Sequence, residues 1–359
     1  MQRIAACAAL FFAFAIHSVG AQDVRTDSAT ARTSADSTKA DSLRADSLQA
    51  DSARANSLTA DSSRSDSADA TSAHVDAARV NSAGTTLATP CGRNRSEVNA
   101  TRAVVAGTFV GANALLFRYF KRAWWSGERA DHFFFRADWD QQFRDQDKLG
   151  HLFGGYHLAR SGDALLRSTC MSRGKALIWS ASYAALFQLQ IEIWDGLYEK
   201  YGFSYADLLA NTVGTALFVA QRLRPELKVI KPTISYSRSA AMRNRRNIPG
   251  EVRPSLDYSG QTYWLSADVH SMLPAEARRF WPSLLRVSAG HSITDWIDPQ
   301  TGATMRARRR ILLSIDLEAE RLPGNAPLWR TIKRQIGFIH LPSPVLQLAP
   351  NVEVIPWYK

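Results

Sequence analysis

The sequence ALIWSASYAALFQLQI, residues 176–191, contains no charged side chain. Residues 103–117 and 208–221 are also uncharged, and residues 149–159 carry histidine but no Asp, Glu, Lys or Arg. Polar connections that contain glycine separate these runs, a pattern that favours about four packed helices. Each run is shorter than the roughly 20 apolar residues that cross a bilayer. We therefore expect buried core helices, with a membrane-seated bundle as the alternative.

The apolar pattern changes to a two-residue alternation in the C-terminal part of the chain. Residues 263–270 and 311–320 alternate apolar with polar side chains, as strands with one polar face do. Weaker candidates are strands at 233–237, 284–289 and 352–355, and a basic helix at 328–338. Four to six strands are fewer than the about eight of a transmembrane barrel. We therefore expect a small antiparallel sheet packed on the helices, and a barrel completed by oligomerisation is the alternative.

Composition divides the chain into four parts, and the fold class that they predict is α+β. Residues 1–21 combine a basic start, an apolar run and small residues up to Ala21, which predicts a secretory signal peptide cut after Ala21. Residues 22–90 hold ten Asp, seven Lys or Arg and no aromatic side chain. A helical core of about four helices is expected at 91–228, and a β-rich region at 229–359.

The segment at residues 22–90 repeats an Asp-Ser or Asn-Ser pair every five residues between residues 36 and 62. Five residues advance about 500° around a helix, so successive repeats point in different directions and no apolar stripe forms. Ser and Asp also favour local hydrogen bonds that compete with helix formation. We therefore expect a disordered, solvated linker rather than a coiled coil.

Removal of the signal peptide leaves two cysteines, Cys91 and Cys170. Cys91 precedes the first expected helix and Cys170 follows the second, so both lie at the same end if these helices are antiparallel neighbours. Outside the cytoplasm two thiols can form a disulfide. We expect this bridge, with two unpaired thiols as the alternative. The sequence has no Cys-x-x-Cys motif, which argues against a cysteine zinc site.

Polar side chains lie near the ends of the last three expected helices. They are Asp147, Lys148 and His151 in one helix, Glu192 and Asp195 in the next, and Asp207 and Asn211 in the last. Residues four apart share a face of a helix. Ser204 is suited to cap the last helix, and Gly214 permits close approach of a neighbouring helix. Because apolar neighbours would desolvate the polar groups, these groups need partners in each other, in an ion or in a ligand head group.

The spacing of these residues resembles the YfiM-like family of predicted periplasmic (lipo)proteins, a domain-of-unknown-function family. The shared pattern is Asp-Lys-x-x-His at 147–151, Glu-x-x-Asp-Gly at 192–196, and Gly-Phe-Ser-x-x-Asp-x-x-Ala-Asn-x-x-Gly at 202–214. Residues 133–139 and 257–266 also resemble longer members. A more distant similarity is to VanZ-like membrane proteins, from which this chain departs in its shorter apolar runs and its export signal. The resemblance implies the helical architecture and an envelope location, and no established reaction.

Two hypotheses account for the polar constellation. Under the first hypothesis, His and carboxylate side chains at helical spacing bind a divalent metal ion. Such an ion can activate water for hydrolysis or bind a phosphate group. In that case Lys148 can contact an anionic head group directly. Under the second hypothesis the same groups pair with one another and hold the helices in register.

The positive charge of the chain bears on its partners. Residues 91–359 carry a net charge of +13, with arginines gathered at 306–310 and 243–246, and aromatic side chains gather at 124–139. An exported chain rarely meets nucleic acid, so we expect no nucleic-acid partner. Anionic lipid, cell-wall polymer or a merely solvated basic face is the expected reading of the arginines. The aromatic cluster is either core packing or an interfacial belt.

The sequence therefore predicts an exported, membrane-associated protein of the periplasm or outer membrane. Its expected role is binding or scaffolding, with the polar constellation contacting lipid head groups. The alternative is a metal-dependent hydrolase that acts on an envelope lipid or a lipid carrier. The oligomeric state is not encoded in any pattern that we recognise.

Overall fold

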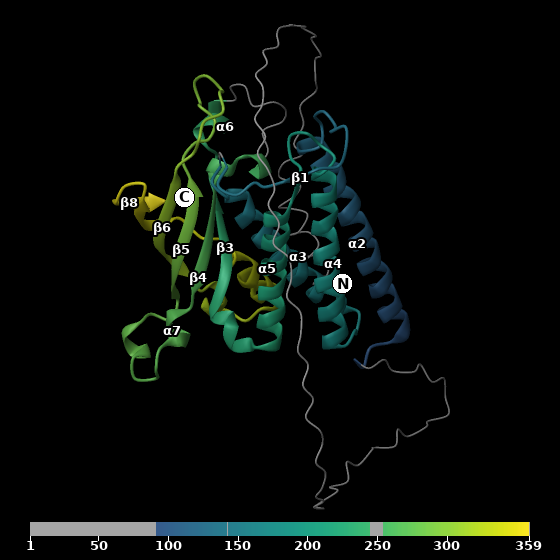
Figure 1. Ribbon diagram of the computed structural model, residues 1–359. Coiled ribbons are helices and arrows are strands. Elements are labelled where there is room, and N and C mark those ends of the chain that lie inside the picture. The colour runs from purple at the N-terminus through teal and green to yellow at the C-terminus, as the bar shows by residue number, and fades with distance from the viewer. Residues whose placement is uncertain (1–90, 142, 245–253, 359) are drawn as a thin grey trace, which may run out of the picture. The chain divides into compact units, whose positions relative to one another are not determined.

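Four long helices come first along the chain, and a six-stranded antiparallel sheet follows them (Figure 1). The computed structural model describes residues 91–141, 143–244 and 254–358. The predicted signal peptide and the 22–90 linker lie outside the described residues. The long helices are α2 (Arg95–Ala123), α3 (Gln146–Ser168), α4 (Arg173–Asp195) and α5 (Tyr205–Leu223). The predicted combination of helices with an antiparallel sheet is confirmed.

The helix boundaries follow from local capping. The Asn94 side chain accepts a hydrogen bond from the backbone N–H of Ser96 and begins α2. The Ser204 hydroxyl accepts one from the backbone N–H of Asp207, so the predicted cap of the last helix is confirmed. Such caps satisfy N–H groups that have no partner inside the helix.

Helices α3, α4 and α5 pack closely around small residues. A Cβ at Gly214 of α5 would clash with the backbone carbonyl of Leu152 in α3, so the close approach expected at this glycine is confirmed. On α3, a Cβ at Gly155 would meet the Asn211 carbonyl of α5 at 2.5 Å. Aromatic and aliphatic side chains fill the space between the helices, among them Tyr156, Leu158, Phe187, Ile191 and Phe218.

Helix α2 differs from the expectation of a buried core helix. Within the uncharged run 103–117, the buried residues are Val105 and Ala112. The helix instead contacts α4 through large rings: Phe109 lies 4.7 Å from Tyr183 between ring centroids. The rest of the run is exposed or partly exposed. By length and composition, α2 is the one helix in the described part of the chain that could cross a membrane.

The sheet is a simple meander in which each strand pairs with the next along the chain. Its strands are β3 (Ile230–Tyr236), β4 (Gln261–Ala267), β5 (Leu285–Ile293), β6 (Arg309–Leu317), β7 (Ser343–Ala349) and β8 (Glu353–Tyr358). The shorter elements are β1 (Phe135–Arg136), β2 (Phe203–Ser204), α6 (Ala240–Asn244), α7 (Val269–Met272) and α8 (Pro327–Ile336). The five sequence-predicted strands and the basic helix are present, whereas β7 was not predicted.

The polar face of the sheet is the buried one. In β6, Leu312, Ser314 and Asp316 are buried, while Ile311 and Leu313 on the opposite face are partly exposed. Buried ion pairs compensate the charges on this face: Arg286 is bonded to Glu318, whose carboxylate also lies 3.2 Å from the Lys231 ammonium. Buried charges need such partners because they have lost their hydration. Alternation predicted the strand but not which face would be covered.

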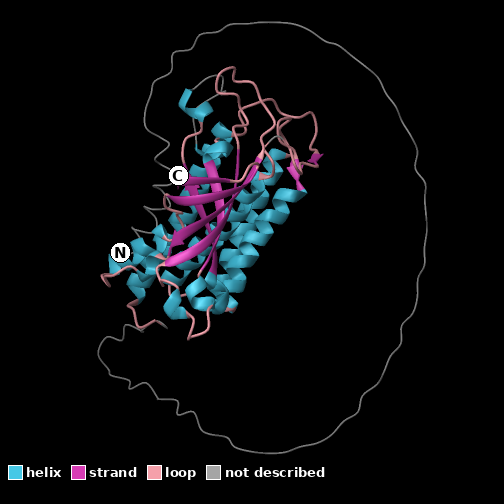
Figure 2. Cartoon of the chain, turned by 90° about the vertical axis from the view of Figure 1, so that its left-hand side faces the viewer, coloured by secondary structure: helices cyan, strands magenta, loops and turns pink. Residues whose placement is uncertain are grey.

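Helix α3 joins the helices to the sheet. The Gln146 side chain donates a hydrogen bond to the backbone carbonyl of Gln261 at 2.9 Å and lies 2.7 Å from Nδ1 of His291. The Tyr263 ring of β4 lies against Gly150 and Phe153 on the same helix. Figure 2 shows the sheet lying over the helices. The start of α3 is therefore enclosed by both parts of the structure.

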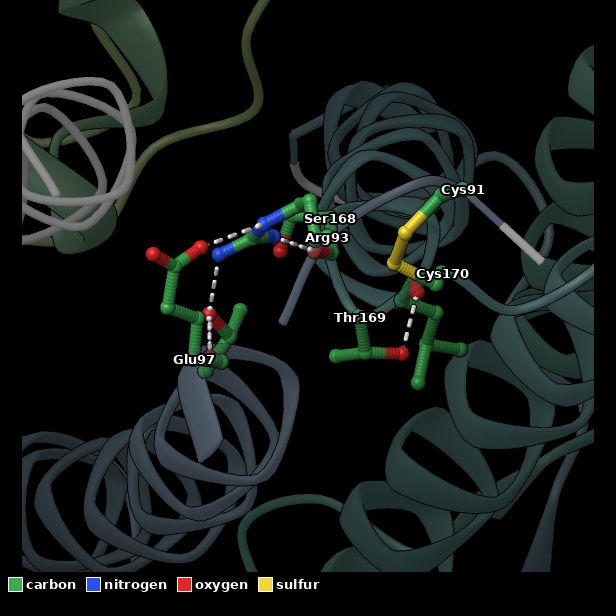
Figure 3. Close-up of a disulfide and its surroundings, with 8 residues drawn as sticks. Cys91, Arg93, Glu97, Ser168, Thr169 and Cys170 are labelled. Atoms are coloured by element: carbon green, nitrogen blue, oxygen red, sulfur yellow. Dashed lines mark hydrogen bonds and ion pairs between the residues drawn. A yellow bond between two sulfur atoms is a disulfide. The ribbon is translucent and has the colours of Figure 1, made fainter. Parts of the chain in front are cut away.

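A disulfide joins Cys91 to Cys170 at one end of the helices (Figure 3). Cys170 follows α3 with a φ of 63°, and α4 begins three residues later. Beside the bridge, Arg93 donates a hydrogen bond to the Ser168 carbonyl at 3.0 Å. The segment before α2 is thereby tied to the α3–α4 connection, across a sequence separation of 79.

Part of the arginine-rich segment 306–310 is neutralised within the chain. Arg309 lies 2.6 Å from Asp145 and 3.0 Å from Asp140, and Arg306 lies 3.3 Å from Asp140. These arginines therefore tie the sheet to the loop before α3. Residues 245 and 246 of the second arginine group lie outside the described residues.

Candidate functional site

The candidate site forms where one end of α3, α4 and α5 meets. Helices α3 and α5 begin here and α4 ends here, so Asp147 and Asp207 stand in first turns while Glu192 stands in a last turn. A helix start carries partial positive charge, which favours the two aspartates, and a helix end carries partial negative charge, which disfavours an ionised Glu192. The short parallel pair of β1 and β2 closes this end and places Asp138 beside Ser204.

Lys148 is buried and lies among three carboxylates. Its ammonium donates to Asp138 and to Asp147, the latter at 3.0 Å, and lies 3.1 Å from Oδ1 of Asp207. Burial by itself lowers the pKa of Lys148, but the charges of Asp147 and Asp207 outweigh it and raise the pKa. The side chain is enclosed and its charge is matched within the cluster, and its direct contact with an external head group stays a prediction.

His151, Asn211 and Glu192 form a hydrogen-bonded chain across three helices. His151 Nδ1 lies 3.0 Å from Oδ1 of Asn211, and the Asn211 amide nitrogen donates to Oε1 of Glu192 at 3.2 Å. With the amide in this orientation, Nδ1 of His151 carries a proton, and Nε2 lies 3.9 Å from Oδ1 of Asp207. A histidine whose Nδ1 proton is held in this way is oriented as a metal ligand usually is.

Two carboxylate oxygens of the cluster lack a hydrogen bond among the described residues, and one of them, Oδ1 of Asp207, pairs with the Lys148 ammonium at 3.1 Å. Glu192 is fully buried, and its Oε2 has no hydrogen-bond partner among the described residues. The ligand atoms of His151, Glu192 and Asp207 all lie within 4.8 Å of one another, and Asp138, Asp147 and Asp207 form a second such group. The Lys148 ammonium already occupies the second group. The first group shares Asp207 with it, so Lys148 contacts this group through Asp207, and His151 is its own cationic side chain.

Burial dominates the protonation of the carboxyl groups. It raises the pKa of Glu192 to about 8, against the opposing charge of His151. It raises the pKa of Asp147 to about 6, helped by the charge of Asp207. For His151 burial acts in the opposite direction, but the carboxylates of Asp207 and Glu192 prevail and raise its pKa to about 9. The cluster therefore holds more carboxyl groups than its cationic side chains balance, and protons make up part of the difference.

Asp195 stands apart from the other predicted site residues. Its Oδ1 accepts a hydrogen bond from the Trp125 indole at 2.6 Å, and it belongs to neither group of close ligand atoms. Burial raises the pKa of Asp195 to about 7, while the Trp125 bond lowers it. Gln188 also serves the helix packing, since its amide donates to the backbone carbonyl of His151 at 3.2 Å.

The structure thus brings six of the seven predicted residues into direct contact and leaves Asp195 with Trp125. Sequence reasoning missed Asp138 and the second role of Ser204, whose hydroxyl donates to Asp138 at 2.7 Å. Asp138 lies in the segment 133–139 that carried part of the family resemblance, and this was the available signal.

Fold and site together define a protein of four long helices and an antiparallel sheet, with a polar site enclosed between helix ends. Residues 139–222 match the family model described as Predicted periplasmic lipoprotein (DUF2279), a periplasmic family of unknown function. The matched residues include all seven predicted site residues. The match confirms the predicted export to the periplasm or cell envelope. No curated protein and no solved structure gives a significant match to the chain.

Proposed function

We propose that this envelope protein binds a divalent cation between its helix ends, on His151, Glu192 and Asp207. The observation that carries the proposal is the unpartnered Oε2 of the fully buried Glu192. A buried carboxylate oxygen without a partner is costly, whereas a cation would satisfy it and replace the protons that burial forces onto the cluster. One imidazole and two carboxylates suit a first-row ion such as Zn²⁺ or Mn²⁺.

The set of ligands also suits a binding role. Three protein ligands leave coordination positions open, as sites that take up a further ligand do. The His151 side chain is 17% exposed, whereas Glu192 is fully buried, so His151 is the more exposed of these two ligands. A phosphate oxygen is a hard anionic ligand that such an ion would accept, and phosphate is the common feature of lipid head groups and lipid carriers. The proposed role is therefore to bind a phosphate-bearing envelope ligand through the ion.

The second candidate function is metal-dependent hydrolysis of such a ligand. The observation that favours it is Asp147, whose pKa of about 6 suits a general base near neutral pH and whose carboxylate belongs to the group that shares Asp207. An open position on the ion would hold the water to be activated. We also propose that the chain is related to the YfiM-like proteins and, more distantly, to the VanZ-like proteins. We propose further that helices α2 to α5 form one four-helix bundle.

The test is metal titration of the purified full chain with Zn²⁺ and with Mn²⁺, after removal of bound metal by a chelator. Wild type and Glu192→Gln are compared with Asp195→Asn, which removes a neighbouring buried acid that is no ligand. We expect one ion per chain in wild type, at least tenfold weaker binding by Glu192→Gln, and unchanged binding by Asp195→Asn.

His151→Ala provides a second variant, because this side chain reaches solvent and its removal is less disruptive to folding. Near-UV circular dichroism reports whether each variant is folded. No ion in wild type, or equal binding by the folded Glu192→Gln and His151→Ala variants, would overturn the proposal. A wild type that binds no ion together with an unfolded Glu192→Gln would show that the carboxylates serve only to hold the helices together.

A further inference from the structure

Helix α2 exposes apolar side chains along much of its length. Val110 is 71% exposed, and Val104 and Leu115 are more than half exposed. An exposed apolar surface of this extent usually marks an interaction site. This apolar surface carries no charged side chain, because residues 103–117 contain no Asp, Glu, Lys or Arg. Arg102 and Arg118 lie directly before and after it.

Helix α4 continues this surface on a parallel axis. Cys91 precedes α2 and Cys170 precedes α4, so the disulfide places the starts of both helices at the same end. Figure 1 shows the two helices side by side. On α4, Trp179 is 62% exposed, and Ile178 and Leu186 are exposed to a similar degree.

Length and charge identify what covers this surface. The uncharged runs 103–117 and 176–191 extend for about 22 and 24 Å, close to the apolar band of about 25 Å that outer-membrane proteins present to lipid. Three of the four ends of these runs are basic, and Glu192 follows the remaining end, that of the α4 run. Exposed Lys and Arg stand at both ends of α2 and at the start of α4: Arg102, Arg118, Lys121, Arg122, Arg173 and Lys175. In a bilayer the acyl chains match the apolar band and anionic head groups match the cations at its borders. Contact with a second protein chain gives no reason for this arrangement.

Aromatic side chains gather at the end where α2 stops. Phe135 and Tyr205 are exposed and stack on each other, with ring centroids 5.2 Å apart and planes 2° apart. Trp139 nearby in the chain is also exposed. Aromatic rings of this kind are enriched at the level of lipid head groups. The candidate cation site lies at the same end, since Glu192 directly follows the uncharged run of α4.

We infer that the exposed face of α2 and α4 lies against the acyl chains of a lipid bilayer with anionic head groups. The basic residues at the helix ends and the aromatic residues beside β1 then meet the head groups. This contact is independent of whether the cation site binds an ion.

The first test is flotation of the full chain with vesicles of phosphatidylcholine and phosphatidylglycerol. Val110→Asp places a charge in the middle of the α2 face, and Val354→Asp does so at an equally exposed valine of β8, 68% exposed. A charge in the centre of the apolar band lowers partitioning by about 100-fold. We expect this loss for Val110→Asp and no comparable loss for Val354→Asp. Wild type that does not bind the vesicles, or equal effects of the two variants, would overturn the inference.

The second test uses tryptophan fluorescence and needs no charged variant. Lipids brominated on their acyl chains quench an indole that contacts them. We expect Trp179→Phe to remove a quenched component and Trp357→Phe, at a residue of β8 that is 66% exposed, to leave it in place. Quenching that is unchanged in Trp179→Phe would contradict contact through α4. Vesicles of phosphatidylcholine alone should bind more weakly, because the basic ends then lack anionic partners.

Discussion

Asp195→Asn should change how the stability of this protein depends on pH. The Asp195 carboxyl is mostly enclosed, and its Oδ1 accepts a hydrogen bond from the Trp125 indole N–H. Burial raises the pKa of this carboxyl from 3.8 to about 7. Between these values the folded state keeps a proton that the unfolded state releases. The stabilisation from the neutral carboxyl is therefore fully present below about pH 4 and is lost as pH rises towards 7. Asparagine keeps the acceptor oxygen and has no proton to lose.

The size of the effect follows from the difference between the two pKa values. Each unit of difference corresponds to about 1.4 kcal/mol, so the loss for wild type reaches about 4 kcal/mol above pH 7. Part of this loss of stability has already occurred at pH 5. The stability difference between Asp195→Asn and wild type should accordingly grow by about 3 kcal/mol in favour of the variant from pH 5 to pH 8.

Urea unfolding of both proteins at pH 5 and pH 8, in the presence of a chelator, measures this difference. Asp131→Asn removes the same charge from an exposed position and controls for the overall change in charge. Glu192 and Asp147 titrate in both proteins, so their contributions largely cancel. If the two proteins lose stability in parallel from pH 5 to pH 8, the neutral buried carboxyl that the reasoning requires does not exist.

Two further predictions concern the packing of the helices. Replacing Cys91 and Cys170 together with alanine should lower the free energy of unfolding by about 4 kcal/mol under oxidising conditions, measured by urea unfolding; a variant as stable as wild type would contradict a bridge that closes a loop of this length. Gly214→Ala should lower the stability by about 1 to 3 kcal/mol or more through overpacking, whereas Gly107→Ala, with open space around it, should be neutral or raise it by up to about 1 kcal/mol. Thermal unfolding compares the last two, and equal melting temperatures would refute the close approach of α3 and α5.

The positions of the helices could be predicted because they depend on local composition. Uncharged runs of 11 to 16 residues between polar connections fall inside α2, α3, α4 and α5. Alternation likewise located β4 and β6, where successive side chains face opposite sides. Strand β7 was not predicted because its alternation is short and contains Pro344, a residue that usually argues against a strand.

Burial was the property that local patterns predicted least well. The run 103–117 is apolar enough for a core, yet α2 lies at the edge of the helices and exposes most of it. In β6 the polar side chains are the covered ones, because buried partners such as Arg286 and Glu318 compensate charge on that face of the sheet. Whether an apolar face meets protein or another medium depends on neighbours that are distant in sequence.

The sequence by itself determined that the polar residues would lie at the ends of helices, since their spacing and the caps around them are local properties. Only the tertiary structure decided how they are paired. It enclosed Lys148 among three carboxylates, joined Asp195 to Trp125, and left Glu192 with an unpartnered oxygen. The reason is that a hydrogen bond or an ion pair requires approach within about 3 Å. That approach is set by which helix ends meet when α3, α4 and α5 pack together, and by the sheet that covers the start of α3.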